Sequence, residues 1–312
     1  MKQVLTLWGE RYLYAPSLFQ KLLSLLLWPL SLLYCGLMNL RYKSKKPHDF
    51  NIPIISVGNL TVGGSGKTPI VSSLAVRYEN VAIVLRGYGR KSEGMVVVSD
   101  GKKVLVDVDV SGDEAMLYAN VLSHAVVIVS EKRESAIEKA KEMGCKVLFL
   151  DDGYNKHQIK KLDILIEVET KNNFCLPAGP YRERLWSGKS ALVIKEDREF
   201  KRSVKLIDET EKMVLVTAIA RAERLDPYLP DVVEKVYFED HHYFTKSELE
   251  AILERTGAES LLVTLKDYVK IRQFNLPVSL MELSLELSED FSQAVDAYVH
   301  NNISKRENSN EE

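Results

Sequence analysis

Cysteine is scarce in this chain. Its 312 residues include three cysteines, an odd number, widely spaced at Cys35, Cys145 and Cys175. We expect such a set to form neither a disulfide framework nor a metal-ligand cluster, because both need several cysteines at recognisable spacings. The cysteine count therefore indicates a reducing compartment.

An excess of charge of one sign is also missing. The 42 Lys and Arg residues nearly balance the 44 Asp and Glu residues, which gives a formal net charge of -2. We expect no nucleic-acid partner, since such partners require a strongly basic surface. The hydrophobic share of 46% and the charged share of 28% exclude a disordered chain, a collagen-like fibre and a polytopic membrane protein. The length suffices for two ordinary domains.

Ionisable acids and bases are absent from residues 22–40 (LLSLLLWPLSLLYCGLMNL), apart from Tyr34. As a helix, this run would rise about 28 Å, close to the thickness of the hydrocarbon layer of a membrane. A basic cluster follows at Arg41, Lys43, Lys45 and Lys46. The late start of the run and the lack of a small-residue cleavage site argue against a signal peptide.

Three arrangements of this segment remain: a spanning helix interrupted by Pro29, a helix lying in the membrane interface, and a buried helical hairpin. The neighbouring Trp and Tyr residues suit the headgroup level, and the basic cluster suits anionic lipid. We therefore expect residues 1–46 to be a membrane-associated helical segment. If the segment spans the membrane, the basic flank places the rest of the chain in the cytoplasm.

From residue 47 onward, short apolar runs alternate with amphipathic stretches. This pattern predicts an α/β fold with a mostly parallel sheet and helices on both faces. The runs expected to be strands lie at 52–57, 81–85, 125–129, 147–150 and 162–168, and then at 191–195, 213–218, 232–238, 261–265 and 278–287. We expect a nucleotide-binding domain at 47–195, a smaller α/β domain at 196–300 and a disordered polar tail at 301–312.

A glycine-rich segment follows the first of these strands and precedes a predicted helix. Residues 58–69 read GNLTVGGSGKTP, and this context indicates a P-loop, whose backbone N–H groups surround nucleotide phosphates. We expect Lys67 to reach the β- and γ-phosphates and the Thr68 hydroxyl to hold Mg²⁺. Thr61 departs from the strict pattern, which has glycine there. The residues expected to bind the nucleotide are Thr61, Val62, Gly63, Gly64, Ser65, Gly66, Lys67 and Thr68.

An acidic pair, Asp151-Asp152, precedes Gly153 at the end of the strand expected near residue 150. A P-loop enzyme needs a carboxylate at the end of a neighbouring strand to hold its metal. Asp-Gly after a strand is also ordinary turn chemistry. Downstream of a P-loop, the metal-site interpretation is favoured.

Together these motifs resemble the tetraacyldisaccharide 4'-kinase family, whose members phosphorylate a lipid A precursor. The resemblance covers about residues 54–270, and the family's P-loop also carries Ser or Thr at the position of Thr61. It rests on eight segments in the family's order: VGNLTVGGSGKTP (57–69), LRGYGRK (85–91), SGDEAML (111–117), SEKR (130–133), LDDGY (150–154), LPAGPYRER (176–184), FEDHHYF (238–244) and VTLKD (263–267).

The chain departs from the family after the acidic pair. Where the family usually continues with an aromatic residue, Gln and His, this chain has Tyr154, Asn155 and Lys156, and His157 comes one residue late. No role is therefore carried over to that histidine.

The resemblance implies a general base and a partner for it. Asp113 would take the proton from the acceptor hydroxyl, and His241 would pair with it and tune its basicity. Taken alone, Asp113 would be interpreted as a helix N-cap and His241 as a structural histidine. Tyr88 would face the lipid headgroup, and no chemistry is implied for Lys266-Asp267.

The resemblance also implies roles at the phosphates. Arg133 and Arg182 would neutralise the transferring phosphoryl group. Glu183, which alone would be interpreted as a solvated surface charge, would join the Mg²⁺ ligands. The implied ligands are Thr68, Asp151, Asp152 and Glu183.

The resulting hypothesis is an ATP- and Mg²⁺-dependent lipid kinase at the cytoplasmic face of the bacterial inner membrane. It would phosphorylate the 4'-hydroxyl of a membrane-held tetraacyl disaccharide 1-phosphate, and it implies no protein partner. One alternative is a membrane-associated P-loop ATPase switch, but such proteins carry a Lys at the start of the P-loop, where this chain has Val62. Another is a GTPase acting as a metal-insertion chaperone, whose guanine-reading Asn-Lys-x-Asp segment is approached only by VTLKD.

Overall fold

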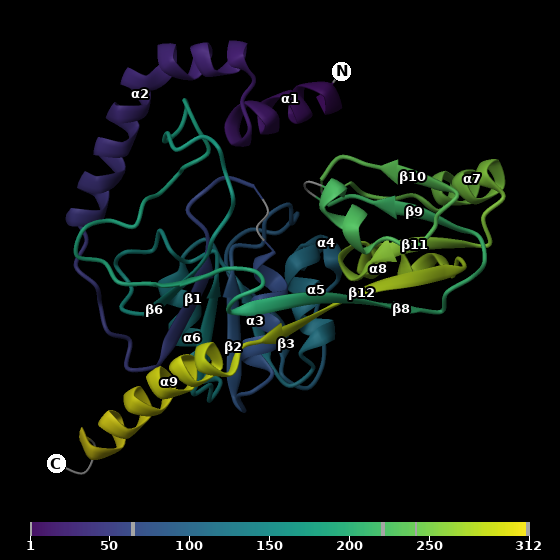
Figure 1. The fold of residues 1–312 in the computed structure, drawn as a ribbon. Helices are drawn as coiled ribbons and strands as arrows, with labels where there is room; N and C mark the ends of the chain where they lie inside the picture. The colour runs from purple at the N-terminus through teal and green to yellow at the C-terminus, as the bar shows by residue number, and fades with distance from the viewer. Residues whose placement is uncertain (1, 64–65, 220–221, 241, 310–312) are drawn as a thin grey trace.

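The computed structural model describes residues 2–63, 66–219, 222–240 and 242–309 (Figure 1). In this part of the chain, two sheets form two lobes, and two helices precede the first lobe. The long strands β8 (Phe200–Ile207) and β12 (Val278–Leu287) pair antiparallel and run from the second lobe towards the first. The α/β prediction with a smaller second α/β unit is confirmed.

The sheet of the first lobe has seven strands in the order β3-β4-β2-β5-β1-β6-β7. All neighbours are parallel except β3, which runs antiparallel to β4. Four strands of mostly apolar sequence are buried throughout, as strands covered on both faces must be. The strands are β1 (Ile54–Gly58), β2 (Val81–Leu85), β3 (Val96–Asp100), β4 (Val126–Val129), β5 (Val147–Asp151), β6 (Leu162–Ile166) and β7 (Leu192–Ile194).

Helices cover both faces of this sheet. On one face, α3 (Lys67–Ala75) and α5 (Asp113–Val121) pack into a core that includes the fully buried Phe149. On the other face, α6 (Arg133–Glu142) packs on a separate core through the small apolar side chains of its inner stripe. A single turn, α4 (Val108–Ser111), precedes α5.

The central strands β1 and β5 fix the position of everything that follows them. They pair in parallel, with Val57 opposite Asp151. Parallel strands end at the same edge of a sheet, so the P-loop after β1 and the acidic pair at the end of β5 lie side by side. Ligands of open α/β sheets bind at this carboxyl edge.

The second lobe has a five-stranded sheet in the order β10-β9-β11-β12-β8, parallel except for β8. Its remaining strands are β9 (Met213–Thr217), β10 (Glu234–Tyr237) and β11 (Ser260–Thr264). Helix α7 (Lys246–Thr256) begins with a capping box between Thr245 and Glu248, and α8 (Leu265–Ile271) follows β11 directly. Two 3-10 helices complete the lobe, at Ala222–Tyr228 and Arg272–Phe274.

The C-terminal segment does not behave as expected. Helix α9 runs from Glu289 to Ser309, so the prediction of disorder is wrong as far as Ser309. Its apolar residues Phe291, Val295 and Val299 recur every four positions, and this stripe is buried in the core of the first lobe. After β12 the chain thus returns to the nucleotide lobe, and Figure 1 shows α9 beside that sheet.

At the other end of the chain, α1 (Lys2–Tyr14) and α2 (Leu18–Lys43) lie along the loops of the first lobe (Figure 1). Helix α2 is long and apolar enough to cross a membrane, by length and composition. Its buried residues are polar, namely Gln20, Ser24 and Ser31. Its apolar face is exposed, and we define this face by Leu18, Phe19, Leu22, Leu25, Leu26, Leu30, Leu32, Leu33, Leu37 and Leu40.

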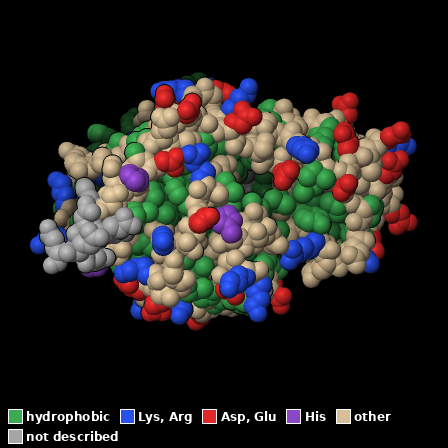
Figure 2. All heavy atoms as spheres, turned by 90° about the horizontal axis from the view of Figure 1, so that it is seen from below, with side chains coloured by type: hydrophobic (Ala, Val, Ile, Leu, Met, Phe, Trp, Pro, Cys, Tyr) green, Lys and Arg blue, Asp and Glu red, His purple; other side chains and the backbone are tan. Residues whose placement is uncertain are grey.

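This arrangement is the reverse of a soluble helix, which buries its apolar stripe. It excludes the buried hairpin for α2. Figure 2 views the molecule from below, the side away from α1 in Figure 1. There, acidic and basic side chains are interspersed, as the near-zero net charge leads one to expect.

One expectation about the cysteines is wrong. Cys35 of α2 and Cys175 form a disulfide across 140 positions of sequence, while Cys145 is buried and free. Ser31 reinforces the same contact by donating to the carbonyl of Cys175 at 2.7 Å. The pairing depends on how α2 lies on the loop that contains Cys175, and cysteine spacing alone carries no information about that.

The position of α9 can be tested by mutation. We expect Phe291→Ala to destabilise the nucleotide lobe by about 3–5 kcal/mol, because it removes a buried aromatic ring from the core. Gln293→Ala, on the exposed side of the same helix, should change stability by no more than about 0.5 kcal/mol. Urea unfolding followed by fluorescence measures both; equal effects would contradict the packing of α9.

Candidate active site

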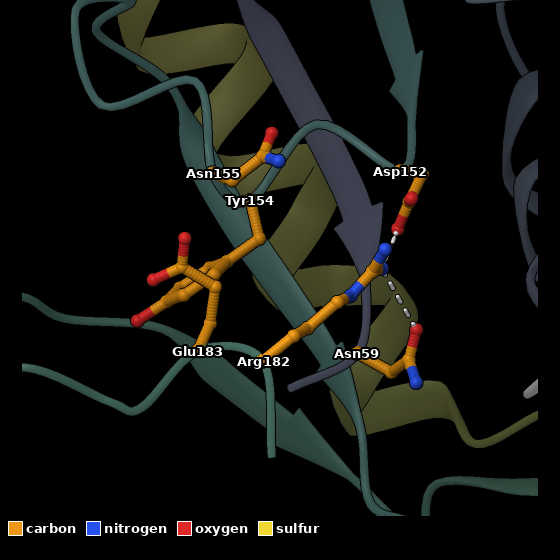
Figure 3. Close-up of a pocket in the computed structure, with 6 residues that line it drawn as sticks. All are labelled: Asn59, Asp152, Tyr154, Asn155, Arg182 and Glu183. Carbon is orange, nitrogen blue, oxygen red and sulfur yellow. Dashed lines mark hydrogen bonds and ion pairs between the residues drawn. The ribbon is translucent and has the colours of Figure 1, made fainter. Parts of the chain in front are cut away.

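A cluster of polar side chains lies at the carboxyl edge of β1 and β5 (Figure 3). Lys67, the first residue of α3, places its Nζ 3.3 Å from Asn59 Oδ1 and 3.8 Å from Asp152 Oδ1. Arg182 donates to Asp152 and lies 3.5 Å from the same Asn59 oxygen. Two cations expected at the phosphates therefore converge on one carboxylate.

Asp152 adopts a left-handed backbone conformation, with φ of 53°. Burial opposes ionisation of this carboxyl, but Lys67 and Arg182 outweigh burial and hold its pKa below the usual value. Asp152 is thus an anion between two cations.

The P-loop itself is described except for Gly64 and Ser65, which lie outside the described residues. Gly63 and Gly66 have φ of 83° and 73°, values that glycine adopts without strain. Gly66 occupies the N-cap position of α3 and offers no side-chain cap. The first N–H groups of α3 are consequently oriented towards a site where phosphates bind in P-loop proteins.

Thr61 and Val62 hold the loop in place. Thr61 is buried and accepts hydrogen bonds from the Asn59 amide at its carbonyl, 2.8 Å, and at its hydroxyl, 3.0 Å. The Val62 N–H donates to the carbonyl of Pro180 at 2.9 Å, and the Val62 carbonyl accepts from the Tyr14 hydroxyl. Both backbone groups of Val62 are therefore used within the protein rather than turned towards a ligand.

Asp151 is the most deeply placed acid of the cluster. Its Oδ2 accepts a hydrogen bond from Tyr118 at 2.9 Å, and Tyr118 also contacts the Thr68 hydroxyl. Burial, with Glu114 and Asp152 nearby, raises the pKa of Asp151 to about 7. Its Oδ1 has no hydrogen-bond partner among the described residues. A cation beside Oδ1 would stabilise the ionised form of this buried carboxyl, which burial otherwise disfavours.

These residues fit a magnesium ion that is also held by phosphates. The described part of the chain contains no group of three or more His, Cys, Asp or Glu side chains able to hold a metal by themselves. Mg²⁺ in kinases needs only one or two carboxylates, with phosphates and water completing its shell. Thr68, Asp151 and Asp152 meet that requirement.

Glu183 lines the same pocket as Asp152 and Arg182, but its carboxylate has other partners in the structure. Its buried carboxylate accepts from Trp186 Nε1 at 2.9 Å, and His157 Nε2 lies 3.6 Å from the same oxygen. In Figure 3 the carboxylate lies beside Tyr154, away from the contact between Arg182 and Asp152. His157, one position late in the sequence, thus reaches Glu183. The interpretation of Glu183 as a solvated surface charge is wrong.

Arg133 begins α6 and is buried. Burial lowers the pKa of Arg133 to about 10, against the opposing influence of Asp151 and Asp152. Its guanidinium donates to the carbonyl of Ser130. The structure therefore keeps a third positive group close to the acidic pair.

Asp113 is the first residue of α5, and Gly112 occupies the N-cap position. The interpretation of Asp113 as a helix cap is therefore wrong. Its Oδ2 lies 3.1 Å from Nζ of Lys270, which comes from α8 of the second lobe. His241 lies outside the described residues. The adjacent His242 accepts from Lys270 at its carbonyl, 3.4 Å.

Tyr88, which the resemblance assigns to the lipid headgroup, is exposed in the loop after β2. Tyr243 of the second lobe donates to the carbonyl of Gly89 at 2.9 Å. The RGYGR and DHHYF segments, more than 140 positions apart in sequence, therefore meet where the lobes join.

The N-terminal helices hold the loop that carries Arg182 and Glu183. Tyr12 donates to the carbonyl of Pro177 at 3.0 Å, and Tyr34 of α2 donates to the carbonyl of Arg182 at 3.1 Å. With the disulfide to Cys175, these contacts link α1 and α2 directly to the site.

Sequence reasoning missed several residues of the site. Asn59 directly follows β1, and a polar residue at that position could have signalled a role. Tyr118 and Lys270 gave no signal, because each looks like an ordinary helix residue. What marks them is the buried acid that each contacts.

Comparison with known proteins agrees with this geometry. The chain matches the family model for tetraacyldisaccharide-1-P 4'-kinase at residues 23–221 and 193–302. The tetraacyldisaccharide 4'-kinase of Aliarcobacter butzleri is 48% identical, with 96% of this chain and 99% of that protein covered. The enzyme of the same name from Campylobacter jejuni (strain 81-176) is 40% identical, with 94% and 96% covered.

The fold also has a solved counterpart. A crystal structure from Aquifex aeolicus, described as an "apo" form of LpxK in complex with ATP, has a TM-score of 0.72. It is 27% identical and covers 90% of this chain and 99% of its own. Fold, motifs and relatives agree over nearly the whole length, and the chain belongs to the tetraacyldisaccharide-1-P 4'-kinase family.

Proposed function

We propose that this chain transfers the γ-phosphoryl group of ATP to the 4'-hydroxyl of a tetraacyl disaccharide 1-phosphate, with Asp113 as general base. Membership of the family gives the activity, tetraacyldisaccharide 4'-kinase in lipid A biosynthesis. The proposal concerns how the residues of this chain carry it out. The observation that carries it is the convergence of Lys67, Arg182 and Asp152 at the carboxyl edge of β1 and β5.

The nucleotide binds where the cations already lie. The phosphates bind in the P-loop at the N-terminus of α3. There they pair with Lys67 and Arg182, which form ion pairs with Asp152 in this structure. Arg133 adds positive charge behind the acidic pair. Phosphoryl transfer needs little covalent chemistry from the protein, so such positioning and charge stabilisation supply most of the catalysis.

Mg²⁺ would be held by the Thr68 hydroxyl together with Asp151 and Asp152. When bound, it neutralises charge on the phosphate oxygens. Tyr118 orients Asp151 through the hydrogen bond to Oδ2, which leaves Oδ1 for the ion. Glu183, which accepts from Trp186 and lines the same pocket as Asp152, would be the fourth ligand.

Asp113 is placed to serve the acceptor. It lies on α5, five residues before Tyr118, which is a rise of about 7.5 Å along the helix. The base is thus near the metal ligands yet separate from them, at the junction with the second lobe. His241, which lies outside the described residues, would tune its basicity, and the exposed Tyr88 would meet the lipid headgroup.

The acceptor's acyl chains remain in a membrane, so the enzyme has to reach its substrate at the bilayer surface. The exposed apolar face of α2 suits insertion into the interface, and its last turn carries Arg41 and Lys43 for anionic headgroups. We assign the chain to the cytoplasmic face of the inner membrane, peripheral or monotopic. The link from α2 to Arg182 then places the catalytic loop next to the bilayer.

The phosphoryl transfer is tested with radiolabelled ATP and the disaccharide monophosphate in detergent. A labelled bisphosphorylated lipid is expected from the parent protein. Lys67→Ala should abolish its formation, because Lys67 is the P-loop lysine at the β- and γ-phosphates. Lys160→Ala, at an exposed surface ion pair, is the control and should keep parental activity. Lys67→Ala activity within about tenfold of the parent would contradict the proposal.

The base is tested by Asp113→Asn. We expect kcat to fall by a factor of about 10²–10⁴, the usual effect of removing a general base. The KM for ATP should stay nearly constant, since Asp113 does not hold the nucleotide. Steady-state kinetics at saturating lipid measure both constants. A kcat close to the parental value would show that another group accepts the proton.

The membrane role is tested on the exposed face of α2 rather than by deletion, because α1 and α2 also hold the catalytic loop. The combined variant Phe19→Ser, Leu22→Ser and Leu26→Ser should bind anionic vesicles at least about tenfold more weakly, since each buried apolar side chain contributes roughly 1.5–3 kcal/mol. Its affinity for ATP should not change.

The matched control replaces three exposed valines away from α2, Val76, Val121 and Val233, by Ser. This control should bind vesicles like the parent in co-sedimentation. Equal vesicle binding by both triple variants would exclude the α2 face as the docking surface.

A further inference from the structure

The VTLKD segment of the second lobe and the helix that it opens have no role in the mechanism above. We propose that Lys270 of this helix, α8, positions the catalytic base Asp113 and thereby makes the base depend on the junction of the two lobes. The inference rests on the proposed function, in which Asp113 accepts the proton. It assigns Lys270 as a positioning residue, acting through Asp113 rather than on the substrate.

The contact is short and buried. Lys270 Nζ lies 3.1 Å from Asp113 Oδ2, and each side chain is only 8% exposed. Asp113 belongs to α5 of the nucleotide lobe and Lys270 to α8 of the second lobe, so the ion pair crosses the junction. Charges removed from water interact strongly when paired, and losing one partner leaves the other buried and uncompensated.

The second lobe holds the ammonium from several sides. The Asp267 carboxylate lies 3.9 Å away, the His242 carbonyl accepts at 3.4 Å, and the Phe244 ring centroid is 5.8 Å away. Counting Asp113, three acceptors and one ring surround the ammonium, which has three donors. Lys270 is therefore enclosed, and Asp113 is its shortest contact.

Asp267 is in turn fixed by β9 and β11. It is fully buried and accepts from Thr217 at 2.7 Å, from Thr264 at 2.8 Å and from the Ala218 N–H at 3.2 Å. This anchors the helix turn that carries Lys270. The chain of contacts runs from the second sheet through Asp267 and Lys270 to the base.

A second lysine of α8 supports the same junction from a different direction. Lys266 lies 3.5 Å from Asp240, and the negative charges of Glu114, Asp240 and Asp113 raise its pKa despite burial. The N-terminal turn of α5 is thus faced by two lysines of one helix. Of these, Lys270 makes the direct contact with the base.

Lys270 connects the base on the first lobe with two segments of the second lobe. Lys270 binds both the Asp113 carboxylate and the backbone of His242, next to the His241 expected to pair with the base. One side chain therefore contacts both the segment that contains His242 and the segment that contains Asp113, and it fixes their relative position. Without it, Asp113 keeps its place on α5 but loses a buried charged partner of its side chain.

The test compares Lys270→Met with Lys270→Arg in the full-length protein. Lys270→Met removes the charge and should lower kcat by a factor of about 10–10³, below or equal to the effect of removing the base itself. The KM for ATP should change by less than about threefold, as expected for a group that does not hold the nucleotide. Lys270→Arg keeps the charge and should recover at least about tenfold in kcat over Lys270→Met.

Two further variants keep the test decisive. Lys270→Gln retains hydrogen-bonding capacity without charge, and its kcat should fall as far as that of Lys270→Met. It replaces Lys270→Met in the comparison if that variant folds poorly. Lys246→Met, at an exposed lysine on α7, should match the parent. The double variant Asp113→Asn with Lys270→Met should lose little more kcat than Asp113→Asn alone, because residues acting as one unit are strongly non-additive.

The outcomes separate the two proposals. If Asp113→Asn keeps its kcat, the base assignment fails, and this inference fails with it. If Asp113→Asn loses kcat but Lys270→Met and Lys270→Gln do not, only the inference is overturned. A multiplicative loss of kcat in the double variant would also overturn it. So would a loss of kcat in Lys270→Met that follows its loss of thermal stability and that Lys270→Arg restores only together with stability.

Discussion

The parallel pairing of β1 with β5 is the constraint on which the rest of the site depends. It sets Val57 opposite Asp151, so the P-loop and the acidic pair leave the sheet at the same edge. Lys67, Asp152 and Arg182 can meet only because this edge brings the loops together. The mostly apolar sequences of the central strands make the pairing stable, since helices bury both faces of the sheet. The geometry of catalysis thus begins with ordinary core packing.

The two lobes share the site rather than dividing it into a catalytic and a supporting part. The nucleotide cluster belongs to the first lobe, whereas the expected base lies where α5 meets α8. Strands β8 and β12 extend from the second sheet towards the first, and α9 then packs on the first core. Because Lys270 of the second lobe contacts Asp113 of the first, a movement of one lobe relative to the other would change the surroundings of Asp113.

The N-terminal helix α2 has two sides of opposite character. Helix α2 turns its leucines outward and its few polar buried residues inward, which is stable only if another apolar phase covers the leucines. On its inner side it contacts the loop that carries Arg182, through Tyr34 and the disulfide to Cys175. The proposed docking face and the loop that carries Arg182, the proposed phosphate-binding arginine, are therefore connected through one helix.

The sequence alone determined the α/β class, the P-loop, the acidic pair and the long apolar run at 22–40, because each depends on residues that are neighbours in the chain or recur at a fixed period. The tertiary structure decided the rest. It paired Cys35 with Cys175, placed Glu183 against Trp186 and His157, continued α9 into the tail, and joined Lys270 to Asp113. These contacts join residues that are far apart in the sequence and follow no repeating pattern. Only the arrangement of the sheets and their loops in space brings them together.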